Sequence, residues 1–216
     1  LYTDEQAFST LATYGNQKHE DSRERSEKLQ RVILETAQRR GTVLIPAFAL
    51  ERTQELLYEL NHLVEHNHIP RMPIFLDSPL AIKATDVFRK YESYYNRKAA
   101  CITDCGDDFF SFPGLVVTRT REESKTVNDA PQPKIIIAGS GMMNGGRILH
   151  HLKRVLPDKN SAVLVIGYQA AGTLGRRIYD GETMVRIHGD KIRVRCRVVA
   201  IGAYSAHADQ DKLLEW

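Results

Sequence analysis

The sequence predicts an α/β fold in which helices cover both faces of a parallel sheet. Five short runs of apolar, mostly β-branched residues recur along the chain. Each is followed by a loop rich in Gly, Pro, Ser or Asp and then by a helical pattern. A strand that is apolar at successive positions must be buried on both faces, which is typical of parallel sheets. The composition agrees, because 42% hydrophobic and 26% charged residues among 216 are typical of globular domains and exclude disorder, collagen and coiled coil.

The elements can be placed in order along the chain. A charged helix is expected over about residues 21–40, because Leu29, Val32 and Ile33 share one face and Gly41 ends it. The five strands are expected at residues 42–45, 74–76, 115–118, 134–138 and 162–166. A helix is expected after each strand: one that begins at residue 52, and others at residues 79–91, 121–127, 147–155 and 174–179. In the second of these helices Ser78 is the expected N-cap and Pro79 the first helical residue.

The end of the chain departs from this rhythm. Residues 184–188 and 192–201 alternate apolar and basic side chains around Gly189-Asp190, which predicts a β-hairpin. Residues 209–216 have the pattern of the beginning of a helix.

Charge, hydropathy and cysteine content narrow the class of protein. No apolar run of about 18 residues exists and no signal peptide is visible, so we expect a cytoplasmic protein without a membrane partner. The chain does not begin with Met, so we expect it to be a piece of a longer protein. The net charge of +3 permits a phosphate-rich partner without requiring one. Cys101, Cys105 and Cys196 lack further ligands at zinc spacing, so they are expected to be buried free thiols.

A glycine-rich loop, residues 139–146, joins a buried strand to a helix. Its glycines let backbone N–H groups approach an anion, and the helix N-terminus adds partial positive charge. Ser140 offers a hydroxyl group and Arg147 opens the helix. The loop matches neither a dinucleotide fingerprint nor a P-loop, so a phosphate cradle and a tight turn without a ligand both remain open.

A second glycine-rich loop, residues 167–175, holds the same position one unit later and is followed by Arg176 and Arg177. Two such loops backed by arginines favour an anion site, although a solvated helix face explains either arginine alone. For Arg52, a structural bond and a phosphate contact are equally compatible with its position in the first turn of a helix. Asp77 ends a strand beside Ser78, so helix capping is the expected role.

Histidines provide one further candidate. His207 follows a strand and precedes a helix, where the helix dipole favours a neutral imidazole that can accept a proton. His150 and His151 diverge by about 100° around their helix, so they cannot share a metal ion. The remaining histidines have no zinc-ligand spacing, so no metal ligands are assigned.

Several of these stretches match one family together. They are Thr13–Asn16 with His19, Pro46–Ala49 with Arg52, Gln54–Leu57, Asp77–Leu80, Ser140–Met142, Gly145–Arg147, Val165–Gln169 with Gly172, Gly175 and Arg176, Ile187–Gly189, and Ser205–Asp209. In this order the chain resembles the β-CASP nucleases of the metallo-β-lactamase superfamily, in the branch of the cleavage-and-polyadenylation nuclease and its prokaryotic relatives.

The resemblance implies a fold and a function. In that family a β-CASP domain is inserted into a metallo-β-lactamase domain with two zinc ions, and RNA is cut in the cleft between them. His207 would be catalytic, beside the scissile phosphate. Ser140, Gly141, Arg147, Arg52 and Arg176 would contact the RNA. Residues 21–182 would form the Rossmann-like β-CASP domain, and residues 183–216 would return into the metallo-β-lactamase domain. Residues 1–20 would be its other flank or an unrelated junction.

The departures from the family pattern matter as well. The zinc-binding His-x-His-x-Asp-His is absent, and Leu11 stands where the family has an acid. Hydrolysis in this family needs metal-activated water, so we expect zinc to belong to the full-length protein and this chain alone to be inactive. The resemblance also allows a homodimer. The alternative is a Rossmann-like module that binds a nucleotide or nucleic-acid backbone without chemistry. Two further classes are disfavoured. Metabolic hydrolases of the same superfamily lack the inserted β-CASP domain, and a dinucleotide oxidoreductase needs an acidic residue at a strand end after the glycines, which is missing here.

Overall fold

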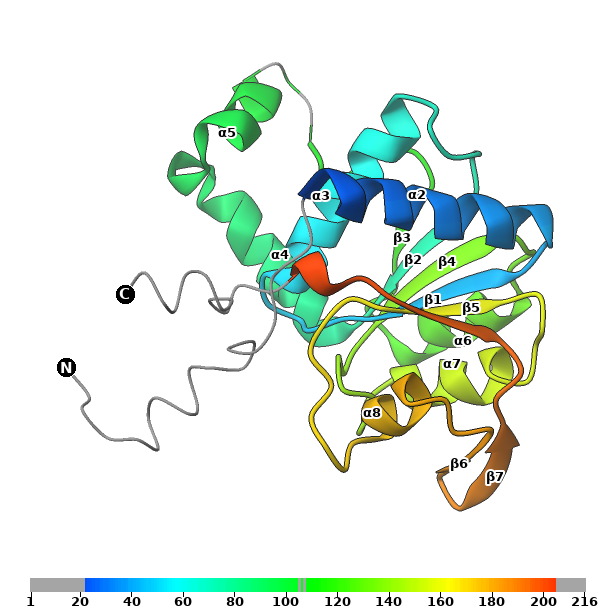
Figure 1. Cartoon of the computed structure of the whole chain (residues 1–216). Coiled ribbons are helices and arrows are strands. Elements are labelled where there is room, and N and C mark those ends of the chain that lie inside the picture. Colours follow the sequence, from blue (N-terminus) through cyan, green and yellow to red (C-terminus); the bar gives the residue numbers. More distant parts are fainter. Residues whose placement is uncertain (1–21, 105, 107, 205–216) are drawn as a thin grey trace, which may run out of the picture.

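The computed structural model describes residues 22–104, 106 and 108–204, which form a six-stranded sheet with helices on both faces (Figure 1). The strand order is β3-β2-β4-β1-β5-β8, and every neighbouring pair is parallel. The strands are β1 Thr42–Pro46, β2 Ile74–Asp77, β3 Leu115–Val117, β4 Lys134–Ala138, β5 Ala162–Val165 and β8 Arg197–Ala200. The predicted α/β parallel-sheet fold is therefore confirmed.

The central strands are buried along their whole length, as continuous apolar runs require. In β1 and β4 every residue is buried, and the register pairs Val43 with Ile135 and Ile45 with Ile137. Successive side chains of a strand point to opposite faces, so each strand contributes to two separate cores.

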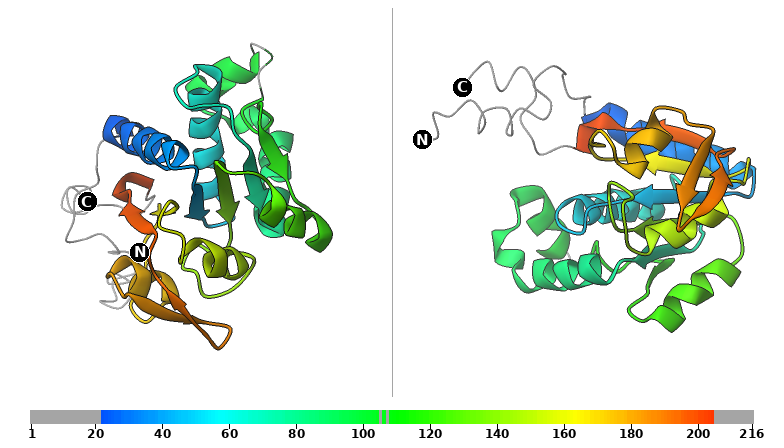
Figure 2. Two further views of the ribbon diagram at one scale, coloured as in Figure 1. Left: turned by 90° about the vertical axis from the view of Figure 1, so that its right-hand side faces the viewer. Right: turned by 90° about the horizontal axis from the view of Figure 1, so that it is seen from below.

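One core lies under three helices, α2 Ser22–Gln38, α3 Arg52–Glu65 and α4 Pro79–Lys90 (Figure 2). Leu29, Ile33 and Leu57 are fully buried against the odd-numbered positions of β1 and β4. The helix α4 begins as predicted, because the Ser78 hydroxyl oxygen accepts the Ala81 N–H and Pro79 is the first helical residue.

The other core lies under α6 Arg121–Asp129, α7 Ile148–Val155 and α8 Leu174–Tyr179. A two-stranded antiparallel hairpin, β6 Met184–Ile187 and β7 Asp190–Arg193, packs against this core through Val185 and Ile187. Helices therefore reach the sheet from both sides, and the two groups follow different strands: α3 and α4 follow β1 and β2, whereas α6, α7 and α8 follow β3, β4 and β5.

Three details differ from the sequence-based expectations. Residues 192–201 do not form one hairpin arm: β7 ends at Arg193, and β8 pairs with β5 in the main sheet. The helix α5 Arg97–Asp104 and the 3-10 turn η1 Glu92–Tyr94 were not expected from the pattern. Of the two described cysteines, Cys196 is buried but Cys101 is exposed, so the expectation of buried thiols is wrong for Cys101.

In the described part of the chain, no helix combines the length and the apolar character that crossing a membrane requires.

Candidate functional site

A cavity of about 1400 Å³ opens at the carboxyl edge of the sheet, where β1, β2 and β4 end. The loops that leave these strands separate here, because those after β1 and β2 lead to helices on one face and that after β4 leads to α7 on the other. In open α/β sheets ligands bind in the crevice outside the strand ends at such a switch point. Phe48, Ser78 and Ser140 come from the three loops and line the cavity together.

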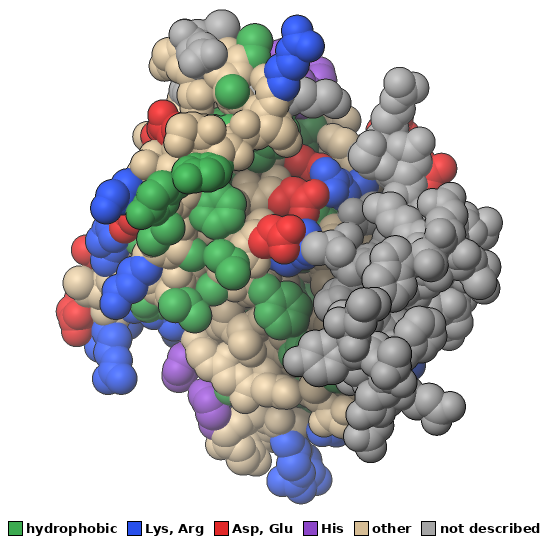
Figure 3. Space-filling model, turned by 90° about the vertical axis from the view of Figure 1, so that its left-hand side faces the viewer, with side chains coloured by type: hydrophobic (Ala, Val, Ile, Leu, Met, Phe, Trp, Pro, Cys, Tyr) green, Lys and Arg blue, Asp and Glu red, His purple; other side chains and the backbone are tan. Residues whose placement is uncertain are grey.

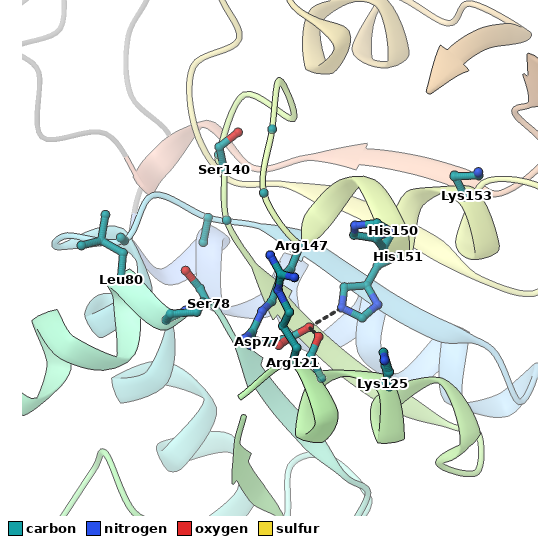
Figure 4. A pocket seen from close by; sticks show the side chains of 18 of the residues that line it. Asp77, Ser78, Leu80, Arg121, Lys125, Ser140, Arg147, His150, His151 and Lys153 are labelled. Carbon is teal, nitrogen blue, oxygen red and sulfur yellow. Dashed lines mark hydrogen bonds and ion pairs between the residues drawn. The ribbon is translucent and has the colours of Figure 1, made fainter. Parts of the chain in front are cut away.

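The loop 139–146 forms one wall of this cavity, and Ser140 projects from it (Figure 4). The Ser140 hydroxyl oxygen accepts the Asn144 N–H at 3.2 Å, and the Gly139 carbonyl accepts the Ile148 N–H at the start of α7. Gly146 has a φ of 82°, and a Cβ at Gly141 would lie 2.7 Å from the Phe48 ring. Both positions therefore require glycine, one for its backbone conformation and one for the close approach of Phe48.

The second glycine-rich loop lies against the first, as its position in the sequence predicts. The Gly175 N–H donates to the Met142 carbonyl at 3.1 Å, and the Gln169 amide donates to the Gly141 carbonyl at 3.0 Å. The Leu174 N–H, at the start of α8, donates to the Asn144 side chain at 3.0 Å. The two loops thus hold each other in one conformation at the rim of the sheet.

Asp77 has a role that differs from the expected helix cap. It is fully buried, and both of its carboxylate oxygens accept two hydrogen bonds. Thr118 and Arg147 donate to Oδ1 at 2.5 Å and 2.6 Å. Ser124 and the His151 ring donate to Oδ2 at 2.7 Å and 2.6 Å. Asp77 is therefore the centre of a buried ionic network below the cavity, whereas Ser78 caps the helix.

The network fixes the first residue beyond the glycine-rich loop. Besides its bond to Asp77, the Arg147 guanidinium donates to the carbonyl groups of Thr118, Arg119 and Thr120 at 2.9–3.2 Å. Burial by itself raises the pKa of Asp77, but the hydrogen bonds from His151, Thr118, Ser124 and Arg147 outweigh it and hold that pKa well below its ordinary value. Asp77 is thus a carboxylate that neutralises Arg147 and locks the loops after β3 and β4 together.

The cavity also carries positive charge that sequence reasoning missed. Its lining includes Arg121 and Lys125 from α6, Lys153 and Arg154 from α7, and His188 from the hairpin. Among the described lining residues the one acidic side chain is Asp77, which is fully engaged. The helical spacing of Arg121 with Lys125 was the available signal, but a solvated helix face has the same pattern.

The predicted site residues fall into two groups. Ser140, Gly141 and Arg147 meet at the cavity. Arg52 instead bonds Glu55 at 2.9 Å and Glu51 at 3.4 Å, and the Arg176 Nε bonds Asp180 at 2.8 Å. Neither of these arginines lines the cavity. His207 lies outside the described residues.

The described residues do not fit a zinc site. No three His, Cys, Asp or Glu side chains in that part of the chain come together in a way that could hold a metal ion. The ring centroids of His150 and His188 lie 5.1 Å apart at the cavity without a carboxylate bonded to either, and His151 is committed to Asp77. No chemical step is therefore assigned to a metal held by these residues.

The residues around the cavity coincide with a known family of domains. A family model described as the Beta-Casp domain matches residues 53–178, which is more than half of the chain. The chain belongs to the β-CASP family. A second model, described as the Zn-dependent metallo-hydrolase RNA specificity domain, matches residues 191–216. The predicted resemblance to the β-CASP proteins of the metallo-β-lactamase superfamily is confirmed by these two matches in this order.

Curated relatives of this β-CASP chain act on RNA or in transcription, according to their names. Ribonuclease TTHA0252 of Thermus thermophilus is 41% identical over 205 residues, which cover 94% of this chain and 47% of the relative. Transcription termination factor FttA of Methanosarcina mazei is 32% identical over 95% of this chain and 33% of its own length. An RNase J-like protein of Methanocaldococcus jannaschii is 35% identical over 85% of this chain and 41% of its own length. The chain thus spans half or less of the length of these relatives.

Proposed function

We propose that this chain is the β-CASP portion of a zinc-dependent RNA-processing nuclease, and that it closes over RNA at a metal site carried by the rest of the protein. The observation that carries the proposal is the cavity at the strand ends, which Ser140, Gly141 and Arg147 line together with the basic side chains of Arg121, Lys125 and Arg154. The names of the relatives, a ribonuclease and an RNase J-like protein, support RNA as the substrate.

The loop 139–146 would hold a backbone phosphate of the RNA. In the described part of the chain, no hydrogen bond uses the N–H groups of Gly145 or Gly146, which precede the first turn of α7. Unbonded N–H groups in a glycine-rich loop before a helix favour an anion, because they present partial positive charge and the helix dipole adds to it. The Ser140 hydroxyl group would add a donor, since its oxygen already accepts the Asn144 N–H.

Arg147 would act by holding this loop in position, since its guanidinium is committed to Asp77 and three carbonyl groups. Its side chain is only 17% exposed. We therefore assign Arg147 to positioning, and assign contact with RNA to the backbone of the loop and to Ser140. This positioning role replaces the contact with RNA that the family resemblance implied for Arg147.

The carboxyl edge of the sheet also offers a surface for a second domain. Figure 3 looks onto this edge and shows apolar side chains gathered near the middle of the face, with Lys and Arg side chains along one border. Leu50 and Leu80, in the loop after β1 and at the start of α4, are 66% and 68% exposed. Exposed apolar side chains beside a polar cavity are typical of an interaction surface. We propose that the metallo-β-lactamase domain of the same protein packs here.

Zinc would be bound outside the described residues, and this chain alone is expected to lack nuclease activity. When bound, the metal would supply activated water and neutralise the phosphate. The residues described here would bind and orient the RNA strand. In this proposal His207 would act beside the scissile phosphate. Residues 183–216, which begin with the hairpin and β8, would lead the chain into the other domain.

The experiment uses the purified 216-residue chain and a fluorescent single-stranded RNA. We expect salt-dependent binding, because phosphate contacts release counterions, and no cleavage when zinc or manganese is added. Ser140→Asp should weaken binding, since it places a negative charge at the proposed phosphate position. Metal-dependent cleavage that persists in His207→Ala would contradict the assignment, and affinity that does not change with salt would contradict the phosphate contacts.

A second function is a binding module without chemistry in its parent protein. The basic cavity favours it as strongly as it favours the nuclease, because binding of a nucleic-acid backbone needs only these charges. The coding sequence around this chain decides between them: a His-x-His-x-Asp-His stretch upstream supports the nuclease, and its absence supports the binding module.

A further inference from the structure

The groove between α6 and α7 extends the cavity away from the glycine-rich loop. From α6 the lining residues are Arg121, Ser124, Lys125 and Asn128. From α7 and the residue before it they are Arg147, His150, His151, Lys153 and Arg154. The four residues of α6, and all of those from α7 except Lys153, have the spacing i, i+3, i+4 and i+7, which places each set on a single helix face. Two helices therefore turn matching polar stripes toward one groove.

Positive charge is spread along both walls of the groove. Arg121, Lys125 and Arg154 are exposed and form no ion pair with any described residue. The acidic side chains of α6 do not offset them inside the groove, since Glu122, Glu123 and Asp129 are not part of its lining. A cleft lined by one sign of charge attracts the opposite sign.

The walls of this groove are held firmly. The helix α6 begins with a capping box, in which Thr120 and Glu123 bond each other's backbone N–H groups. At its other end the buried Lys134 amine donates to the carbonyl groups of Val127 and Ala130 at 2.6 Å and 2.7 Å. Because the helices are held in place, no rearrangement of the backbone is needed to bring these cations to an anion.

The hairpin closes the far end of the groove. His188 lies over His150, with ring centroids 5.1 Å apart, and Lys153 holds the hairpin to α7 through Asp190 at 2.5 Å. The cavity is larger than the roughly 300–1,000 Å³ that small-molecule pockets occupy. No aromatic ring except those of histidine lines the part between the described helices, so bases would find little stacking there.

We propose that the α6–α7 groove is a second phosphate-binding subsite, which holds the backbone of single-stranded RNA next to the phosphate bound by the loop 139–146. This proposal rests on the proposed function, in which that loop holds the first phosphate. The contacts would come from Arg121, Lys125 and Arg154, and they would be independent of base sequence, because phosphate contacts position a strand without reading it.

The test compares two lengths of oligouridylate, a 2-mer and a 16-mer, by fluorescence anisotropy over a range of salt concentrations. The variant Arg121→Gln with Lys125→Gln should lower the salt slope of 16-mer binding by about 1.4, since each lost contact to a single strand removes about 0.7. Arg154→Gln alone should lower it by about 0.7. The 2-mer has a single internucleotide phosphate, which would occupy the loop, so it should bind each variant like the wild type.

The matched control is Arg71→Gln with Lys159→Gln. Both residues are exposed, and they precede β2 and β5, at the opposite edge of the sheet. This variant removes as much positive charge as the Arg121→Gln, Lys125→Gln variant. If the position of the charges decides binding, it should leave the salt slope of 16-mer binding unchanged.

Three outcomes distinguish the proposals. If Ser140→Asp weakens both lengths and the groove variant weakens only the 16-mer, the groove is a second subsite. If Ser140→Asp weakens both lengths and the groove variant behaves like the control, the groove proposal is overturned and the proposed function stands. If neither length binds the wild-type chain, both are overturned.

Discussion

Arg147 and Asp77 form a buried ion pair, with Nη1 and Oδ1 2.6 Å apart, between a helix start and a strand end that are 70 residues apart in sequence. Asp77 ends β2, and Arg147 follows the glycine-rich loop after β4. The pair therefore joins the two neighbouring strand ends on which the cavity is built. His151, one turn further along α7, bonds the second oxygen of the same carboxylate at 2.6 Å.

Loss of the Asp77 charge should destabilise the domain. Asp77→Asn leaves Arg147 and His151 without their common anion in a buried position, and breaking a buried pair in this way costs roughly 3–5 kcal/mol. Urea denaturation monitored by circular dichroism measures the change in the free energy of unfolding. Asp86→Asn is the control, because the Asp86–Arg119 pair is exposed, and it should hardly move the urea midpoint. Equal effects of the two substitutions would show that the buried pair is unimportant.

The same carboxylate should make stability depend on pH in the acid range. The pKa of Asp77 is lower in the folded chain than the ordinary value of about 3.9, so the folded state binds fewer protons. Its contribution to the free energy of unfolding is therefore complete above about pH 4 and is lost as the pH falls further toward the folded-state pKa. Denaturation curves between about pH 5 and pH 2.5 should fall more steeply for the wild type than for Asp77→Asn. Parallel curves would contradict this assignment.

RNA binding should tighten as the pH falls below about 6.5, the ordinary pKa of histidine. Burial lowers the pKa of His150, helped by the neighbouring His188, His151 and Lys153, and opposed by Asp77. The ring is therefore neutral at pH 7 in the free chain, and a phosphate in the groove would favour its protonated form. His150→Gln should flatten the dependence of 16-mer affinity on pH. The control is His62→Gln: the ring of His62 does not line the cavity, so this substitution should leave the pH dependence unchanged.

Thiol reactivity should separate the two described cysteines. Burial raises the pKa of Cys196 to about 11, and its side chain lies in the core under α7, whereas Cys101 is exposed on α5. Because the thiolate is the reactive form, N-ethylmaleimide should modify Cys101 in the native chain and Cys196 only after denaturation. Peptide mapping by mass spectrometry measures both sites. Rapid native labelling of Cys196 would show that this core is open.

Local pattern was sufficient for the main elements. The runs that became β1, β4 and β5 are apolar at consecutive positions, and burial on both faces follows from that pattern alone. The helix α5 was not predicted because, among its described side chains, only Ala99 and Ile102 pack against the core, which leaves little periodicity to detect. The strand β8 lies in a stretch whose alternating pattern predicted a hairpin arm. It pairs instead with β5 at the edge of the main sheet, which the local pattern does not reveal.

The candidate site was predictable only in part. The glycine-rich loop was visible because its residues are contiguous, and the family resemblance pointed to the same loop. The role of Asp77 was not visible, because its four donors lie 41 to 74 residues away in sequence. The basic groove was missed for a similar reason: each helix alone has an ordinary charged face, and only tertiary packing brings the two faces together.

Photo-crosslinking gives the most direct test of whether this edge of the sheet handles RNA. A 16-mer containing 4-thiouridine would be crosslinked to the wild-type chain, and the modified peptides would be identified by mass spectrometry. Crosslinks should map to residues 139–154 and 121–128, which line the cavity, and should be lost from the second range in the Arg121→Gln, Lys125→Gln variant. Crosslinks confined to the opposite edge, around residues 66–73 and 156–161, would contradict the account.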